Sequence, residues 1–381
     1  MRRNAVRLAC LTFTLTLVAA CADGVATPVS TPSQSTTTTG SPTAAMPTPS
    51  AGATSSSNLT VTPEPSAETL TGQIVFYDDR TAGDHQQIYL ERADGSDVRQ
   101  LVMSDFDDVK PQLSPNGRTV AFTRYAPDSS NIFVVNVDGT GLREIDKASC
   151  VKPCGGDEDV SWSPDGTQFV VTRDLFETFP LTATSTPYNV GLWLIHADGT
   201  GAHQITLKGR ICNNGCPGGA QDNRAAWSPD GKRLVFTRDT YTSPEQFGIF
   251  TIAADGSDLR RVTPEGMNVD DASWSPDGSL IAFQSPPEAN EGGEQNIYTI
   301  HPDGTGFKQL TAHLSSDPQA RQGTNHAWWS PDGSKIVFSH NPGMNGVADL
   351  FVMNRDGTDL HAIAATPLNE NAPVWGRSPS P

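Results

Sequence analysis

The fold of this chain is specified by a short repeated stretch, seen most fully as Ala226-Trp227-Ser228-Pro229-Asp230-Gly231. Two residues later comes the apolar run Leu234-Val235-Phe236. Proline presets the φ angle of the first corner of a tight turn and glycine accepts positive φ, so the stretch predicts strand, hairpin turn and strand. Repetition of such a motif at a regular spacing indicates a repeat architecture, whatever the role of each single residue. Copies lie at Ser161–Gly166, Ser273–Gly278 and Trp328–Gly333, with a weaker form at Leu113–Gly117 and a truncated one at Val374–Trp375.

Each repeat continues into a third apolar stretch and a second tight turn. In the unit that starts at Ala225, Ile249–Ile252 precedes the turn Ala254–Ser257, and Arg260–Thr263 ends the unit. Short β-branched and aromatic runs between Gly and Asp residues, with no amphipathic helical period, are typical of strands. Each unit is therefore predicted to be a four-stranded sheet. Its middle strands are apolar on consecutive residues, which requires cover on both faces, as in radially stacked sheets.

The middle strands of the unit occur six times in the sequence. The predicted second strands are Ile74–Phe76, Val120–Phe122, Phe169–Val171, Leu234–Phe236, Ile281–Phe283 and Ile336–Phe338, and the predicted third strands are Ile88–Leu90, Ile132–Val134, Leu192–Leu194, Ile249–Thr251, Ile297–Thr299 and Leu350–Val352.

These units resemble the propeller repeats of the TolB family, whose hallmark is a Trp-Ser-Pro-Asp-Gly turn, an apolar strand and a later Asp-Gly hairpin. The resemblance covers residues 71–377 and implies an all-β, six-bladed β-propeller. The first unit begins at its second strand, Gln73–Phe76, and a spare first strand remains at Ala372–Trp375. We therefore expect the C-terminal strand to complete the first blade and remove the open sheet edge.

The region before the propeller departs from this family. TolB carries an α/β domain ahead of its propeller and works with the Tol-Pal machinery, whereas residues 1–70 of this chain have a different composition. A Tol-Pal role is therefore not expected, and only the fold carries over from the resemblance.

Residues 1–20 are predicted to be a lipoprotein signal peptide. Arg2 and Arg3 precede the apolar run Leu8–Ala20, which is too short to span a bilayer but suits a secretory signal. Small residues directly before Cys21 resemble the lipobox of bacterial lipoproteins, which implies that Cys21 is acylated; an ordinary cleaved signal is the alternative. Residues 21–70 are rich in Ser, Thr, Pro and Ala, so we expect a disordered tether at the cell envelope, on the periplasmic or cell-surface side.

The chain is strongly acidic, with 26 Lys and Arg against 43 Asp and Glu and a formal net charge of −17. Such a surface repels phosphates, which argues against nucleic acid as a partner and against membrane contact other than through the lipid anchor. Cationic partners or metal ions suit this charge; alternatively, the acidity only keeps an exported protein soluble. We expect a monomer whose partner is an envelope protein or glycan.

Four cysteines fall in two long connections between units. They form the pairs Cys150-x-x-x-Cys154 and Cys212-x-x-x-Cys216. In an exported protein disulfides are the expected state, and we favour one bridge within each connection because the two are equivalent. A four-cysteine zinc site is the alternative, since the spacing is tolerable for zinc.

Polar residues precede each innermost strand and are predicted to surround the central channel. Carboxylate and amide oxygens are the ligands of hard cations, so this ring predicts a Ca²⁺ site or a receptor for a basic peptide. The alternative is that these side chains cap the ends of short strands. The predicted ring is Asp108, Asp157, Asp159, Asp222, Asp270, Asp271, Asn325, His326 and Asn371.

Catalytic motifs are absent from the sequence. It contains no Gly-x-Ser-x-Gly elbow, His-Glu-x-x-His helix or glycine-rich phosphate loop, so no catalytic residue is assigned. Of the histidines, His85, His313, His326 and His340 lie near the face opposite the Pro-Asp-Gly turns, where the longer connections gather and binding is expected. The sequence therefore favours a protein- or glycan-binding scaffold at the envelope over its alternative, a metal-dependent lyase or hydrolase acting on polysaccharide or peptide.

Overall fold

The computed structural model describes most of the chain from Leu70 onward. By its internal contacts the chain divides into Met1–Glu64 and Pro65–Pro381. The predicted signal peptide, Cys21 and most of the predicted tether lie outside the described residues. Those described are 70–78, 85–127, 129–145, 154–176, 187–206, 220–240, 246–285, 295–311, 324–340, 348–364 and 369–379.

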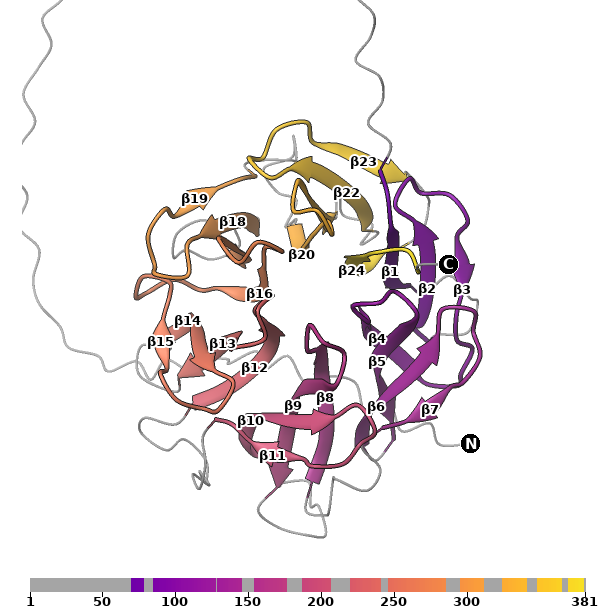
Figure 1. The fold of residues 1–381 in the computed structure, drawn as a ribbon, viewed down its shortest axis with the longest axis horizontal. Coiled ribbons are helices and arrows are strands. Elements are labelled where there is room, and N and C mark those ends of the chain that lie inside the picture. Colours follow the sequence, from indigo (N-terminus) through magenta and orange to yellow (C-terminus); the bar gives the residue numbers. More distant parts are fainter. Residues whose placement is uncertain are drawn as a thin grey trace, which may run out of the picture. The chain divides into compact units, whose positions relative to one another are not determined.

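The described residues form strands, turns and bends and no helix, so the second unit of the chain is an all-β propeller. Figure 1 shows its sheets arranged around a central axis, with the first strand of each repeat innermost. The innermost strands are β4 (Asp107–Leu113), β8 (Cys154–Trp162), β12 (Ala220–Trp227), β16 (Asp270–Trp274), β20 (Thr324–Trp329) and β24 (Asn371–Gly376).

The second and third strands form the apolar centre of each repeat. The second strands are β1 (Gln73–Asp78), β5 (Thr119–Ala126), β9 (Gln168–Phe176), β13 (Arg233–Thr240), β17 (Ile281–Ser285) and β21 (Lys335–His340). The third strands are β2 (Gln87–Arg92), β6 (Ser129–Asn136), β10 (Pro187–His196), β14 (Gln246–Ala253), β18 (Asn296–Ile300) and β22 (Asp349–Asn354).

The outermost strands are short and lie at the rim of the ring (Figure 1). They are β3 (Arg99–Gln100), β7 (Arg143–Glu144), β11 (His203–Gln204), β15 (Arg260–Arg261), β19 (Lys308–Gln309) and β23 (His361–Ala364).

The hairpin turn between the first two strands of each repeat is held by a fixed set of hydrogen bonds. In the deciding stretch, Ser228 Oγ donates to Asp230 Oδ1 at 2.7 Å, and the backbone N–H of Arg233 donates to Ser228 Oγ at 2.9 Å. Gly231 has a φ of 69°, which a side chain would disfavour. Serine, aspartate and glycine are therefore used here for turn geometry, and the same contacts recur in the other copies.

The C-terminal strand closes the ring as predicted. β24 pairs antiparallel with β1, and the pairing places Trp375 opposite Ile74 and Val374 opposite Val75. The indole N–H of Trp375 also donates to the backbone oxygen of Thr71 at 2.9 Å. The first unit is thus assembled from both ends of the propeller sequence, in the order β24-β1-β2-β3.

The expectation of six separate blades needs a correction. Four sheets are separate and four-stranded: β24-β1-β2-β3, β12–β15, β16–β19 and β20–β23. The other two repeat units, β4–β7 and β8–β11, belong to one eight-stranded sheet. A parallel pairing of Ser130 with Gly156 joins β6 to β8. The approach requires glycine, since a Cβ at position 156 would lie 2.3 Å from the Ser130 backbone oxygen.

Apolar clusters hold neighbouring repeat units together. Each of six clusters contains residues from two units adjacent in the chain or at the closure. One of them packs Ile74, Phe76 and Trp375 against Val337 and Leu350, which joins the last repeat to the first. The core is therefore a ring of interfaces rather than one centre, and the axis is left open for polar side chains.

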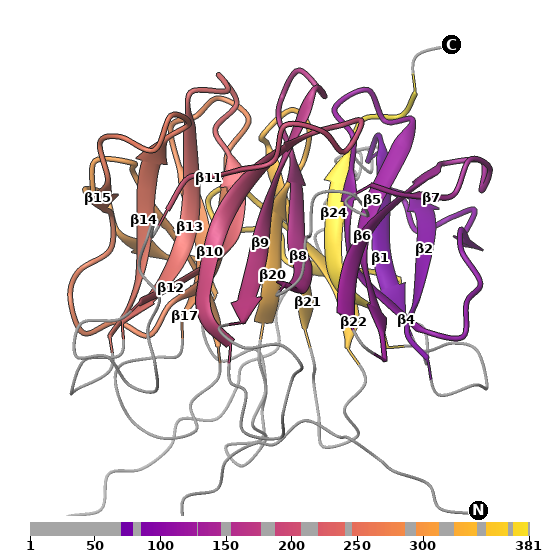
Figure 2. The ribbon, with the colours of Figure 1, turned by 90° about the horizontal axis from the view of Figure 1, so that it is seen from below.

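Figure 2 shows the strands in side view, running steeply along the axis from one face to the other. Within the part of the chain that the structure describes, no helix is long and apolar enough to cross a membrane.

Candidate functional site

Each innermost strand carries a β-bulge in its middle. The pairing register shifts there, for example between Asn223 and Ala226 in β12, and the bulged residue has positive φ although it is not glycine. A bulge re-aims a side chain, and here it directs one residue of each strand toward the axis. These axial residues are Lys110, Asp159, Arg224, Asp271, His326 and Ala372, with φ between 46° and 55°.

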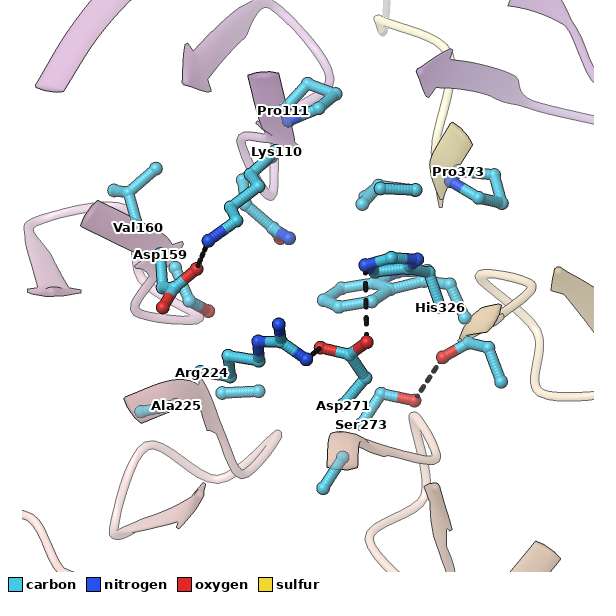
Figure 3. Close-up of a pocket in the computed structure, with 18 residues that line it drawn as sticks. Lys110, Pro111, Asp159, Val160, Arg224, Ala225, Asp271, Ser273, His326 and Pro373 are labelled. Atoms are coloured by element: carbon cyan, nitrogen blue, oxygen red, sulfur yellow. Dashed lines mark hydrogen bonds and ion pairs between the residues drawn. The ribbon is translucent and has the colours of Figure 1, made fainter. Parts of the chain in front are cut away.

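The axial residues line a cavity of about 620 Å³, including space open to solvent, to which every innermost strand contributes three residues. Figure 3 shows its ionisable side chains pointing toward one another across the axis. In ring order the axial positions carry Lys, Asp, Arg, Asp and His, so that basic and acidic groups alternate. The remaining position is Ala372, which leaves one sector of the ring without an ionisable group.

One network of the cavity is centred on Asp271. The Arg224 guanidinium lies 3.0 Å from Asp271 Oδ1, and His326 Nε2 lies 3.2 Å from Asp271 Oδ2 (Figure 3). Arg224 also contacts Asp270, the neighbouring carboxylate. The two carboxylates, Asp271 first, hold the pKa of Arg224 above its ordinary value, so this cation stays charged.

A second network joins Lys110 to the adjacent unit. Lys110 Nζ donates to Asp159 Oδ1 at 2.5 Å and lies 3.7 Å from Glu158 Oε2, which in turn accepts a hydrogen bond from the Tyr125 hydroxyl. Burial alone would lower the pKa of Lys110, but the Asp159 carboxylate and its neighbours raise it. Burial opposes the ionisation of Asp159, yet Lys110 and Arg224 keep its pKa below the ordinary value. Both members of the pair are therefore charged.

His326 is held as a neutral imidazole. Because a carboxylate accepts, the proton on His326 lies on Nε2, facing Asp271. The other nitrogen, Nδ1, is buried and has no hydrogen-bond partner among the described residues. Burial lowers the pKa of His326, with Asp271 opposing and the Arg224 and Lys110 cations reinforcing the shift. Protonation would bury a second N–H without an acceptor, which costs free energy.

The uncharged sector of the cavity is apolar. It is formed by Ala372, Pro373 and Val374 of β24 together with Pro111 of β4 and Trp328 of β20. The cavity thus offers hydrogen-bonding groups along one arc and apolar surface along the other, the combination found in ligand sites.

The predicted channel positions of Asp108, Asp157 and Asp222 are wrong. All three side chains are fully buried inside their own sheets. Each carboxylate accepts two hydrogen bonds from an arginine of the next strand; Asp157, for example, is 2.5 Å from both Nε and Nη2 of Arg173. The side chain two residues before the bulge points into the sheet, whereas the bulged residue points to the axis. The other two pairs are Asp108 with Arg124 and Asp222 with Arg238.

Of the other predicted site residues, some line the cavity and others do not. Asp159, Asp271 and His326 line the cavity as expected, whereas Asp270 faces Arg224 from the side. Asn371 pairs with Tyr77, and Ala372 takes the axial position instead. The side chain of Asn325 lies outside what the structure describes.

Lys110 and Arg224 were missed as site residues by the sequence analysis. Both stand three residues before the Trp or Leu that ends the innermost strand, as do Asp159, Asp271 and His326. That constant offset was the available signal, but choosing residues by oxygen ligands alone passed over the two cations.

The predicted metal and cysteine sites differ in where their residues lie. No group of three or more His, Cys, Asp or Glu side chains is placed to hold a metal ion among the residues with described positions. The predicted Ca²⁺ ligands do not converge, because three of them lie buried within their own sheets. Each of these three carboxylates is paired with an arginine. Cys150, Cys212 and Cys216 lie outside the described residues, as does the side chain of Cys154, so the disulfide and zinc alternatives stay predictions.

Comparisons with known proteins agree with the fold. The TolB beta propeller domain family matches residues 70–318. The chain is 28% identical over 306 residues to a TolB homologue of Chlorobium luteolum, covering 80% of this chain but only 60% of the relative's length.

Two solved structures share the architecture. TolB from Acinetobacter baumannii superposes with a TM-score of 0.59 at 16% identity, over 81% of this chain and 67% of that chain. A chain of a nidogen/laminin complex superposes with a TM-score of 0.55 at 10% identity, over 81% of this chain and 100% of that one. At these identities the likeness shows the fold alone. Because the family match extends over more than half of the chain, this protein belongs to the TolB β-propeller domain family.

Proposed function

We propose that this protein is an envelope-anchored, six-bladed propeller that acts as a protein-binding scaffold and receives a segment of its partner in the axial cavity. In this proposal the two halves of the eight-stranded sheet work as two blades. The single observation that carries it is the ring of axial side chains, which gathers five ionisable groups from five different strands around one cavity.

The chemistry of the cavity suits a peptide segment. The charges along the polar arc are already paired with one another, so a ligand with a large net charge would have to break an ion pair to enter. An uncharged segment can instead donate to Asp159 and Asp271 and accept from Lys110 and Arg224. The apolar arc, including Trp328, can receive an apolar side chain of the same segment.

The acidic surface supports the same function at longer range. A net charge of −17 accelerates the approach of a partner with a basic surface, through the field rather than through contacts. The propeller of the nidogen/laminin complex, similar in fold only, is an instance of this architecture in a protein assembly.

The proposed anchor is a lipid on Cys21, with residues 21–70 as the tether. The motif at the end of the apolar run Leu8–Ala20 supports it. Metabolic labelling with a radioactive fatty acid tests it: the full chain should incorporate label, and Cys21→Ser should not. Equal labelling of the two chains would contradict the anchor without affecting the proposed binding site.

The binding site is tested by a double variant, Lys110→Gln with Arg224→Gln, in cross-linking to envelope extracts followed by quantitative mass spectrometry. The matched control, Lys232→Gln with Arg260→Gln, removes the same charge from exposed side chains. Proteins cross-linked to the natural chain should be lost with the axial variant and kept with the control.

A second variant guards against a folding defect. Ala372→Gln adds a side chain to the uncharged sector and leaves both ion-pair networks intact, so it should block the cavity without removing a pair. Thermal melts establish that each variant is folded. Recovery of the same proteins by the axial variants and the control would exclude the cavity as the binding site.

The other predicted function, a metal-dependent lyase or hydrolase, is not favoured by any specific observation. Among the residues whose positions are described, Asp159 and Asp271 bind Lys110 and Arg224, and His326 contacts Asp271, rather than forming a set of metal ligands.

A further inference from the structure

A second cavity, which we call the interblade cavity, lies beside the channel between the β12–β15 and β16–β19 sheets. Its volume is about 500 Å³, including space open to solvent. Arg224 lines both cavities, but the other lining residues come from different positions of the strands. The side chains that matter for its chemistry are Asn223, Thr237, Phe247, Asn268, Asp270 and Gln284.

The polar groups of the interblade cavity combine donors and acceptors. Each asparagine or glutamine amide offers an acceptor oxygen and two N–H donors, and threonine offers a hydroxyl. Asn223 carries a group in need of a partner, because its Oδ1 is buried and no group among the described residues donates to it. An unfilled buried acceptor is costly unless a ligand or water donates to it. The cavity therefore presents an unused acceptor to whatever occupies it.

A metal ion does not suit this cavity. Asp270 Oδ1 already accepts from the Thr237 hydroxyl at 3.1 Å and from the backbone N–H of Asp271 at 3.0 Å, while Oδ2 faces the Arg224 guanidinium. Asp239 is the other carboxylate of the lining, and the described residues place no group of three or more His, Cys, Asp or Glu side chains to hold a metal ion. Gln284 is likewise committed, since its Nε2 donates to Asp271 Oδ2 at 2.9 Å and its Oε1 accepts from the backbone N–H of His326 at 3.0 Å.

We propose that the interblade cavity binds a neutral sugar in its pyranose form. Each sugar hydroxyl both donates and accepts, which matches the amide groups, and one hydroxyl satisfies Asn223 Oδ1. The partly buried ring of Phe247 packs against the C–H face of the sugar. This site is separate from the proposed protein-binding site and does not rest on it.

The test is a titration of the full chain with methyl β-glucopyranoside, methyl β-galactopyranoside, N-acetylglucosamine, cellobiose, lactose and chitobiose, followed by saturation-transfer NMR and calorimetry. At least one should bind with a dissociation constant on the order of millimolar, as expected for a small polar ligand. Tighter binding of a disaccharide than of its monosaccharide would show that the natural ligand of the cavity is the end of a glycan. Equal binding identifies a free sugar.

The variant Asn223→Leu should weaken sugar binding about tenfold, the cost of one lost buried hydrogen bond. Its matched control is Asn371→Leu, which changes an asparagine in the same position of another innermost strand and should leave binding unchanged. Phe247→Leu keeps the wall apolar but removes the ring, and should also weaken binding. Each variant is first shown to be folded by its thermal melt.

The proposal is overturned if none of these sugars binds, or if binding is equally strong in Asn223→Leu and Phe247→Leu. It is also overturned if Ca²⁺ produces binding heat that Asn223→Leu abolishes, because the cavity would then be a cation site.

Discussion

The two halves of the ring use different chemistry at the same position. In the half formed by β4–β15, each repeat unit contains a fully buried aspartate paired with an arginine from the adjacent strand, sixteen positions later in the sequence. In the other half the arginine positions are occupied by Ser285, His340 and Asp78, and the aspartate position in the β16–β19 sheet lies at Val269. The repeat therefore fixes the backbone but leaves the interior chemistry of each sheet free to vary.

The buried pairs of the first half are supported by aromatic rings. The guanidinium carbon of Arg173 lies 4.6 Å from the Trp193 ring centroid, and that of Arg124 lies 4.4 Å from the ring of Phe133. Such contacts compensate in part for the water that each arginine loses. Because buried ion pairs add little net stability, the two halves differ in the chemistry of their sheet interiors more than in the stability that these pairs contribute.

The largest effect should come from breaking one pair. Arg173→Met leaves the Asp157 carboxylate buried and unpaired, which should lower the free energy of unfolding by about 3–5 kcal/mol. Urea denaturation measures this. The matched variant in the other half, Ser285→Ala, loses one hydrogen bond to the Asn268 backbone oxygen and should cost about 1 kcal/mol. Equal losses would remove the distinction between the halves.

Replacing both members of the pair should be milder. Asp157→Leu with Arg173→Met leaves no unpaired charge, so the double variant should be close in stability to the natural chain in the same urea experiment. The single and double variants together form a mutant cycle. Additive losses would mean that the pair contributes no coupling, against the bidentate geometry observed.

A smaller effect is pH-dependent and involves Asp174, which belongs to the half with buried pairs. Burial, reinforced by the carboxylate of Glu158, raises the pKa of Asp174 to about 7. The unfolded carboxyl titrates near pH 3.9, so between about pH 4 and pH 7 the folded chain binds the proton more tightly and loses stability as pH rises.

Asp174→Asn should therefore be more stable than the natural chain at pH 8 and no more stable at pH 4. Chemical denaturation at the two pH values measures this difference. A gain of the same size at both values would show that the substitution acts through packing rather than through ionisation.

The smallest effect concerns His326, in the half without arginine pairs. Because burial lowers the pKa of His326, the imidazole of the folded chain should take up its second proton at a lower pH than an exposed histidine does. The measurement is the ring proton shift by NMR, assigned with His326→Gln. In the urea-unfolded chain the same resonance should titrate near pH 6.5. Titration at that pH in the folded chain would contradict the buried, neutral assignment.

Much of the fold could be predicted because its signals are local. The Ser228 to Gly231 turn and its copies are specified by residues that bond to one another within five positions, so periodic sequence is enough to locate them. The closure of β1 by β24 followed from one missing and one spare strand. The eight-stranded sheet could not be foreseen, because it depends on one parallel contact between Ser130 and Gly156 of successive repeats.

The site was predicted less well because its geometry depends on a β-bulge in each innermost strand. A shift of one position in a strand moves a side chain to the opposite face, and alternation alone cannot place the shift. Asp157 and Asp159 are two residues apart and were assigned together, yet one is buried against Arg173 and the other faces Lys110 on the axis.

By itself the sequence determined the repeat, the turns, the all-β class and the closing strand, since each depends on neighbouring residues or on counting. The tertiary structure alone decided which charges meet on the axis, which are buried in arginine pairs and where cavities remain. These features arise from the packing of side chains on different strands, such as Arg224 with Asp271 and His326, whose distances no local pattern encodes.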